Sequence, residues 1–202
     1  MRVKTEAKRE AILEVATKTF AELGYEGTSM SELARRIGGS KGTLYNYFCS
    51  KEALFIHIVL RVIANQVAPA LEALVDRAHD DPFTVLREFG QKLLTAVTQP
   101  DPIAALRMVV SQRKLEGFGR QFFELGPNMG LEGLARYLSE ATKAQRLNVS
   151  NPQAAAQQLQ ALFEAETNWR VLLGFDTQFT NEEISTFVER ALTVFIAAYG
   201  VH

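Results

Sequence analysis

Hydrophobic residues recur along this chain at steps of three and four positions, which is the period of a helix with one apolar face. The pattern returns in every segment between glycine, proline and serine breaks. No stretch shows the two-residue alternation of a half-buried strand, and no internal repeat or low-complexity segment is visible. The sequence therefore predicts an all-α protein with nine or ten helices.

The first 48 residues predict three helices. The first has apolar positions from Ile12 to Leu23 and ends at Gly24. The second begins at Thr28 or Ser29, with Glu32 at the spacing of a capping box, and ends at the glycine pair 38–39. Ser40 caps a short third helix that turns Leu44 and Phe48 inward. The second and third helices are joined by a glycine-containing turn of three or four residues, which is the length found in a helix-turn-helix.

The remaining chain predicts a larger helical domain. Ser50 caps a long helix that Pro69 should kink or split. Later helices should begin at three Asp-Pro or Asn-Pro pairs, at 81–82, 101–102 and 151–152. Another should follow the break at 126–130. Thr180 caps the last helix, with Glu183 as its capping-box partner. The last two long helices run over about 152–173 and 181–199. We expect two domains, a helix-turn-helix domain over residues 1–50 and a helical body over 51–202.

The amino-acid composition excludes several classes of protein and of site. The 202 residues are 47% hydrophobic and 22% charged, which suits a globular chain that can bury a core. The single cysteine, Cys49, excludes an internal disulfide and a multi-cysteine metal site, and the three histidines are too dispersed for a metal. No signal peptide or uninterrupted run of about 18 apolar residues is seen. We expect a cytoplasmic protein with no cofactor, no metal and no membrane partner.

Charge is unevenly distributed. Residues 1–51 carry nine Lys or Arg against six Asp or Glu, whereas residues 52–202 carry thirteen against seventeen. A basic N-terminal quarter on an acidic body favours a module that faces an anion, although a difference of this size also arises by chance.

The third predicted helix has the side chains that a DNA-recognition helix needs. Opposite its buried face it presents small polar groups, a lysine and two tyrosines, which suit phosphate oxygens and base edges. We expect Tyr45 and Lys51 to bind phosphates, and Lys41 and Thr43 to face bases. A plain structural role, in which the tyrosines cover the edge of the core, is the alternative. The full set of expected DNA contacts is Ser29, Ser40, Lys41, Gly42, Thr43, Tyr45, Asn46, Tyr47 and Lys51.

The block KREAILEVATKTFAELGYEGTSMSELARRIGGSKGTLYNYFCSKEALF, residues 8–55, closely resembles the N-terminal domain of TetR-type transcriptional regulators. The resemblance implies that the matching positions in this set touch DNA. Gly39 stands where that family more often has Val or Ala, and Cys49 where Lys or Arg is frequent. Glycine at position 39 should loosen the packing of the turn, and cysteine at position 49 should remove one phosphate contact.

The body resembles the C-terminal domain of AefR-like members, in segments such as FGQKLLTAVTQPDPIAALRMVVSQRK and VLLGF. This implies a ligand-sensing and dimerisation domain, with the last two long helices pairing in a homodimer. Gln112 replaces an acidic residue of that pattern. Apolar pockets carry a few polar groups, although an aromatic residue on a helix is more often core. Candidate ligand contacts are Arg107, Met108, Gln112, Phe122, Phe123, Phe163, Glu166, Asn168, Trp169 and Arg170.

We therefore expect a dimeric regulator that binds double-stranded operator DNA and is released by a small lipophilic effector, most simply a repressor. An activator would use the same DNA-binding surface. A helical carrier or enzyme is a further alternative, but the sequence has no zinc-protease motif or phosphate-binding loop. A helix-turn-helix that has lost DNA binding is disfavoured by the intact polar set.

Overall fold

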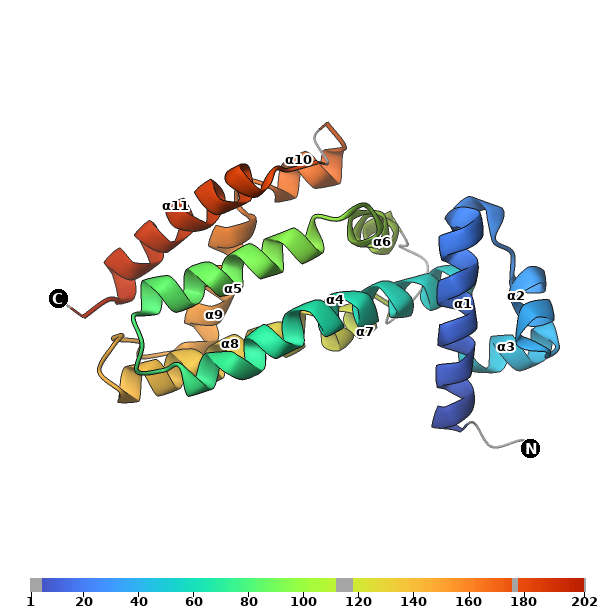
Figure 1. Ribbon diagram of the computed structural model, residues 1–202, viewed down its shortest axis with the longest axis horizontal. Helices are drawn as coiled ribbons and strands as arrows, with labels where there is room; N and C mark the ends of the chain where they lie inside the picture. Colours follow the sequence, from blue (N-terminus) through green and yellow to red (C-terminus); the bar gives the residue numbers. More distant parts are fainter. Residues whose placement is uncertain (1–4, 112–117, 176–177, 202) are drawn as a thin grey trace. The chain divides into compact units, whose positions relative to one another are not determined.

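The computed structural model describes residues 5–111, 118–175 and 178–201, which form eleven helices and no strand (Figure 1). This confirms the predicted all-α fold. The chain divides into two compact units, residues 1–62 and 63–202, so the division lies twelve residues beyond the expected boundary at residue 50. The helices are α1 (Glu6–Gly27), α2 (Met30–Ile37), α3 (Lys41–Tyr47), α4 (Lys51–Asp76), α5 (Pro82–Val97), α6 (Pro100–Ser111), α7 (Phe118–Leu125), α8 (Pro127–Lys143), α9 (Pro152–Glu164), α10 (Asn168–Leu173) and α11 (Asn181–Tyr199).

In the first unit, helices α2, α3 and α4 begin at the caps that the sequence predicts. The side-chain oxygens of Ser29, Ser40 and Ser50 each accept a hydrogen bond from the backbone N–H three residues later, at 3.0–3.1 Å. Gly38 ends α2 in the left-handed conformation, with φ of 69° and ψ of 33°. The expected end of α1 at Gly24 is an interruption, because the chain leaves helical geometry there and resumes for one short turn to Gly27.

Helix α4 runs unbroken from Lys51 to Asp76. The split that we expected at Pro69 does not occur. Burial of Val67 and Leu74 on either side of the proline holds the helix together. By length and composition alone α4 is apolar enough to cross a membrane, with a mean hydropathy of 1.6. Leu54, Phe55 and Ile56 are buried in the structure, as in a core helix.

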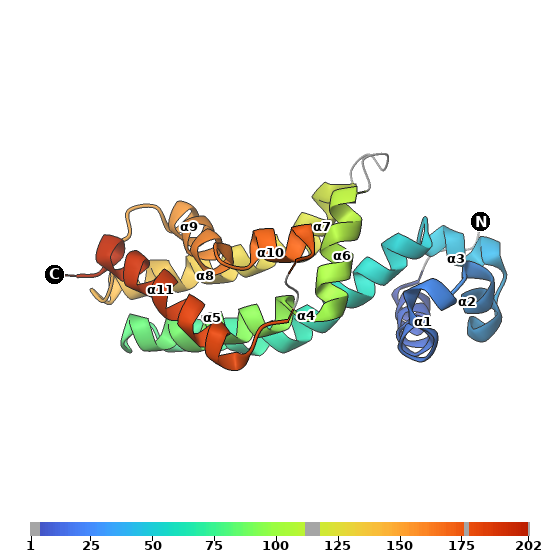
Figure 2. The same cartoon turned by 90° about the horizontal axis from the view of Figure 1, so that it is seen from above.

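In the second unit α11 packs against α5 and α9, and α8 against α9 (Figures 1 and 2). The predicted caps at Asp81, Asn151 and Thr180 are confirmed, and Thr180 and Glu183 form the full capping box. The predicted helix over 152–173 is wrong in one respect, because it breaks into α9 and α10. Thr167 is buried at the break and its hydroxyl donates to the carbonyl of Glu164, a local bond that competes with the helical ladder.

Three helices of the second unit pack tightly at Gly90 of α5. A Cβ built on Gly90 would lie 2.7 Å from Phe163 of α9 and 3.0 Å from Val188 of α11. These distances are too short for van der Waals contact, and Phe163 is itself fully buried. The three helices therefore meet at a position that has room for hydrogen only.

Gly90→Ala should destabilise the protein by about 1–3 kcal/mol, because the buried neighbours must move to admit a methyl group. The measurement is urea unfolding followed by circular dichroism. Gly130→Ala in α8 is the matched control, since nothing lies within 4 Å of its added Cβ. It should be neutral or stabilising by up to about 1 kcal/mol through helix propensity. Equal losses in the two variants would contradict this account of the packing.

Candidate functional site

Helices α2 and α3 form a helix-turn-helix whose turn is Gly38, Gly39 and Ser40. Helix α3 has only seven residues. Leu44 and Phe48 are 1% and 2% exposed, so they anchor α3 on the first unit as predicted. A Cβ on Gly39 would meet nothing closer than 3.9 Å, so the turn is open at the position where this chain carries glycine.

The opposite face of α3 is accessible to a partner. Lys41, Gly42 and Asn46 are exposed, and Tyr45 is 49% exposed although it is aromatic. Ser29 and Ser40 are exposed at the starts of α2 and α3. The structure thus brings most of the predicted DNA-facing residues to the surface of one small motif.

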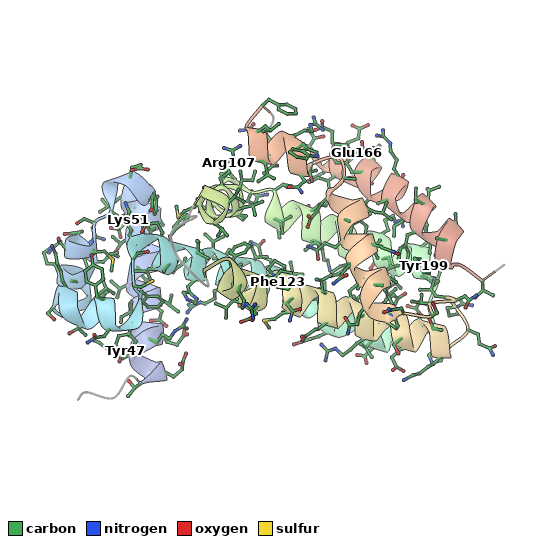
Figure 3. The ribbon with its side chains drawn as sticks, turned by 180° about the vertical axis from the view of Figure 1, so that it is seen from behind. Tyr47, Lys51, Arg107, Phe123, Glu166 and Tyr199 are labelled. Atoms are coloured by element: carbon green, nitrogen blue, oxygen red, sulfur yellow. The ribbon has the colours of Figure 1, made fainter. Side chains whose placement is uncertain are left out.

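Two further members of the predicted set already have partners inside the first unit. Tyr47 is half-buried, and its hydroxyl accepts a hydrogen bond from the backbone N–H of Thr5 at 3.2 Å. The ammonium of Lys51 donates to the carbonyls of Tyr25 and Thr28. Figure 3 labels both side chains in the first unit. These contacts were not expected from sequence, because they join residues more than 20 positions apart.

Glu32 holds the outer face of α2 together. Its carboxylate accepts hydrogen bonds from Arg35, at 2.7 and 2.9 Å, and from Arg36 at 2.7 Å. Bonds from Arg35 first, and then from Arg36, lower the pKa of Glu32 to about 2. Arg36 also pairs with Glu22 of α1. The basic side chains of α2 are therefore tied to carboxylates, whereas the ammonium of Lys41 has no hydrogen bond or ion pair among the described contacts of this unit.

A histidine on α4 joins α1 to the end of α3. The guanidinium of Arg9 lies 3.2 Å from Nδ1 of His57 and 5.3 Å from the centre of the Phe48 ring. The rings of Phe48 and His57 meet edge to face, with centroids 5.4 Å apart. Burial, and then the charge of Arg9, lower the pKa of His57 to about 4. His57 is therefore neutral near pH 7 and accepts from Arg9.

Comparison with known proteins agrees with this geometry. Residues 12–58 match the family described as bacterial regulatory proteins, tetR family, and residues 84–201 match the AefR-like transcriptional repressor, C-terminal domain. The second match alone spans more than half of the chain. This chain belongs to the TetR family of transcriptional regulators.

Individual relatives extend the comparison. The HTH-type transcriptional regulator RutR of Escherichia coli K12 is 36% identical over 83 residues, which are 41% of this chain and 38% of that protein. The flavonoid-responsive regulator FrrA superposes with a TM-score of 0.64 at 30% identity, covering 97% of this chain and 98% of the other. A TetR-family structure from Mesorhizobium loti reaches a TM-score of 0.79 at 24% identity, covering 99% and 100%, and shows the shared fold.

The candidate ligand residues of this TetR-family chain are dispersed over the second unit. Phe163 is fully buried in the core, whereas Trp169 is 70% exposed, Phe123 is 44% exposed and Asn168 is exposed. Met108 and Phe122 are half-buried on α6 and α7, and Gln112 lies outside the described residues. Their role as effector contacts stays a prediction.

The charged candidates in the second unit are engaged in structural contacts. Nε of Arg107 on α6 donates to the carbonyl of Val171 on α10 at 2.8 Å. Glu166, between α9 and α10, pairs with Arg190 of α11 at 2.6 Å. The guanidinium of Arg170 lies 5.0 Å from the centre of the Phe179 ring. Arg107 thus fixes α10 to α6, and Glu166 fixes the α9–α10 link to α11 (Figure 3).

His57 should make the stability of the TetR-family fold depend on pH. Its pKa in the folded chain, about 4, lies below the ordinary value of 6.5. Between these values the unfolded chain binds the proton and the folded chain does not, so stability falls as pH falls from 6.5 towards 4. The histidine should contribute a loss of about 1–2 kcal/mol between pH 7 and pH 5.

The measurement is urea unfolding of the wild type and of His57→Gln at pH 7 and pH 5. Gln retains an acceptor for Arg9 but does not titrate, so the variant should lose less stability on acidification. An identical pH dependence in the two proteins would show that His57 is not the group responsible.

Proposed function

We propose that this protein is a homodimeric repressor that binds operator DNA through α2 and α3 and leaves it when a small lipophilic effector binds the second unit. The observation that carries the proposal is the accessible polar face of α3, from Ser40 to Asn46, on a helix whose other face is anchored by Leu44 and Phe48. A seven-residue helix placed in this way suits the major groove. The proposed contacts are Ser29, Ser40, Lys41, Gly42, Thr43, Tyr45, Asn46 and Tyr47.

Two observations support the proposed effector: the first supports a repressor domain in the second unit, and the second supports an effector of low polarity. The second unit matches the AefR-like repressor domain, and FrrA, which is 30% identical over nearly the whole chain, is described as flavonoid-responsive. Half-buried residues of α6 and α7, such as Met108 and Phe122, are better candidates for contact than Phe163, which already fills the core. The effector would act by preferring one of two arrangements of the repressor, since a ligand that binds both equally shifts nothing.

A second copy of the chain is the proposed partner of α9 and α11. An apolar groove of about 370 Å³ lies between these helices, lined by Ala161, Leu162, Val194, Phe195 and Ala198 together with Gln158 and Tyr199. Val194 is 57% exposed there. Helix α10, which follows α9 in the chain, also has exposed apolar side chains. Trp169 is 70% exposed, and Leu173 and the following Phe175 are each 68% exposed. Exposed apolar area of this extent is characteristic of an interface.

The same proposal places the protein in the bacterial cytoplasm and assigns it no enzymatic activity. Activation in place of repression would use the same DNA-binding face. A reporter gene behind the bound promoter separates the two, because deletion of a repressor raises expression and deletion of an activator lowers it.

Binding to a DNA fragment from the protein's own promoter region should weaken steeply with salt, with a slope of log affinity on log salt of about −0.9 per phosphate neutralised. Lys41→Ala should reduce the magnitude of this slope by about one, since it removes a positive charge beside DNA. Lys18→Ala on the exposed side of α1 is the matched control and should leave the slope unchanged. Fluorescence anisotropy over a salt series measures both. Salt-independent binding, or none to any genomic fragment, would refute the proposal.

Residues that position the protein and residues that read bases should behave differently. Tyr45→Ala should weaken binding to all DNA sequences by a similar factor, whereas Thr43→Ala should relax preference at one operator position by about 1–3 kcal/mol. A library of operator variants bound and sequenced with each protein tests this assignment. The same profile for both variants would show that it is wrong.

Val194→Arg should dissociate the dimer, because the substitution places a charge in the apolar groove between α9 and α11. The control is Val75→Arg, which adds the same charge at an exposed valine of α4. Sedimentation equilibrium should give the wild type and the control twice the chain mass of 22.5 kDa and the groove variant a single chain mass. A monomeric wild type, or a dimeric Val194→Arg, would contradict the proposed interface.

A further inference from the structure

The ammonium of Lys51, the first residue of α4, is surrounded by groups of its own unit. Nζ lies 2.9 Å from the carbonyl oxygen of Tyr25 and 3.1 Å from that of Thr28. It also lies 4.0 Å from the centre of the Tyr25 ring, within the range of a cation–π contact. An ammonium has three N–H donors. Two are used by the carbonyls and the ring faces the charge, so the group is directed inward.

The carbonyls that Lys51 holds belong to the end of α1 and to its link with α2. The last carbonyls of a helix lack helical partners and carry a partial negative charge, which a cation stabilises. The last turn of α1 has no basic residue of its own. Lys51 supplies that charge from α4. The link is constrained further by the hydroxyl of Thr28, which donates to the carbonyl of Gly24 at 2.7 Å and is itself buried.

A second contact joins the same two segments. The hydroxyl of Tyr25 donates to Oε1 of Glu52 at 2.9 Å. Burial alone would raise the pKa of Glu52, but bonds from its own backbone N–H, from Ser50 and from Tyr25 lower it, so the carboxylate is a charged acceptor. Burial first, and then the bond to Glu52, raise the pKa of Tyr25, which therefore remains a neutral donor. Lys51 and Glu52 thus hold the link from α1 to α2 through adjacent positions of α4.

The position of this link decides where α2 and α3 lie. Thr28 is followed directly by Ser29, whose side chain caps α2, and α2 leads through the turn at Gly38 into α3. We propose that Lys51 is a positioning residue: it clamps the α1–α2 link to the start of α4 and so sets the orientation in which α3 meets DNA. This differs from the phosphate contact expected from sequence, and it rests on the proposed DNA-binding function.

The test compares Lys51→Met with Lys41→Met, which remove the same charge from α4 and from the exposed start of α3. Lys51→Met should weaken operator binding about tenfold at fixed salt and leave the salt slope at the wild-type value. Lys41→Met should reduce the magnitude of the slope by about one. In the absence of DNA, amide hydrogen exchange over residues 25–32 should rise at least severalfold in Lys51→Met only. A slope reduced by about one in Lys51→Met, with wild-type exchange, would overturn the proposal in favour of a phosphate contact.

A measurement on the wild-type protein covers the case in which Lys51→Met does not fold. Limited labelling with an amine-reactive acylating reagent, read by peptide mass spectrometry, should modify Lys51 far more slowly than Lys41 in the free protein. Operator DNA should protect Lys41 and leave the rate at Lys51 unchanged. Equal reactivity of the two lysines in the free protein would overturn the clamp. Failure of the wild type to bind any DNA would overturn the proposed function, while the labelling of the free protein would still decide the clamp.

Discussion

A seven-residue helix has almost no stability of its own in water, so α3 depends on the burial of Leu44 and Phe48. These two residues lie four positions apart and fix which side of the helix faces the first unit. The polar side must then face outward, and with it Lys41, Tyr45 and Asn46. The same apolar pair that makes the helix possible therefore exposes the surface that is proposed to read DNA.

The contacts around α3 explain how such a small motif is held. Serine caps start α2, α3 and α4, and Gly38 ends α2 in the left-handed conformation. Arg9, Phe48 and His57 join the end of α3 to α1 and α4, and Lys51 joins the α1–α2 link to α4. The first turns of α4 thus belong to the N-terminal unit, which accounts for a division of the chain after residue 62.

Local chemistry made much of this predictable. Caps, glycine breaks and helical period act within four residues, so the sequence predicted the starts of α2, α3, α5, α9 and α11 and the buried face of α3. Interactions between distant residues were not predictable in this way. The clamp at Lys51 spans 26 positions to Tyr25, and the break between α9 and α10 depends on the burial of Thr167. The candidate effector residues were aromatic and polar residues on apolar helices, and residue type alone cannot separate pocket contacts from structural ones such as Arg107 with Val171.

Dimethyl sulfate protection of a bound genomic fragment tests the central claim most directly, because the reagent methylates guanine N7 in the major groove and adenine N3 in the minor groove. Two copies of α3 in the major groove should protect guanine N7 in two half-sites, with centres about 34 Å apart or a multiple of that distance. Protection confined to adenine N3, or no protection on any fragment that the protein retains, would contradict the claim.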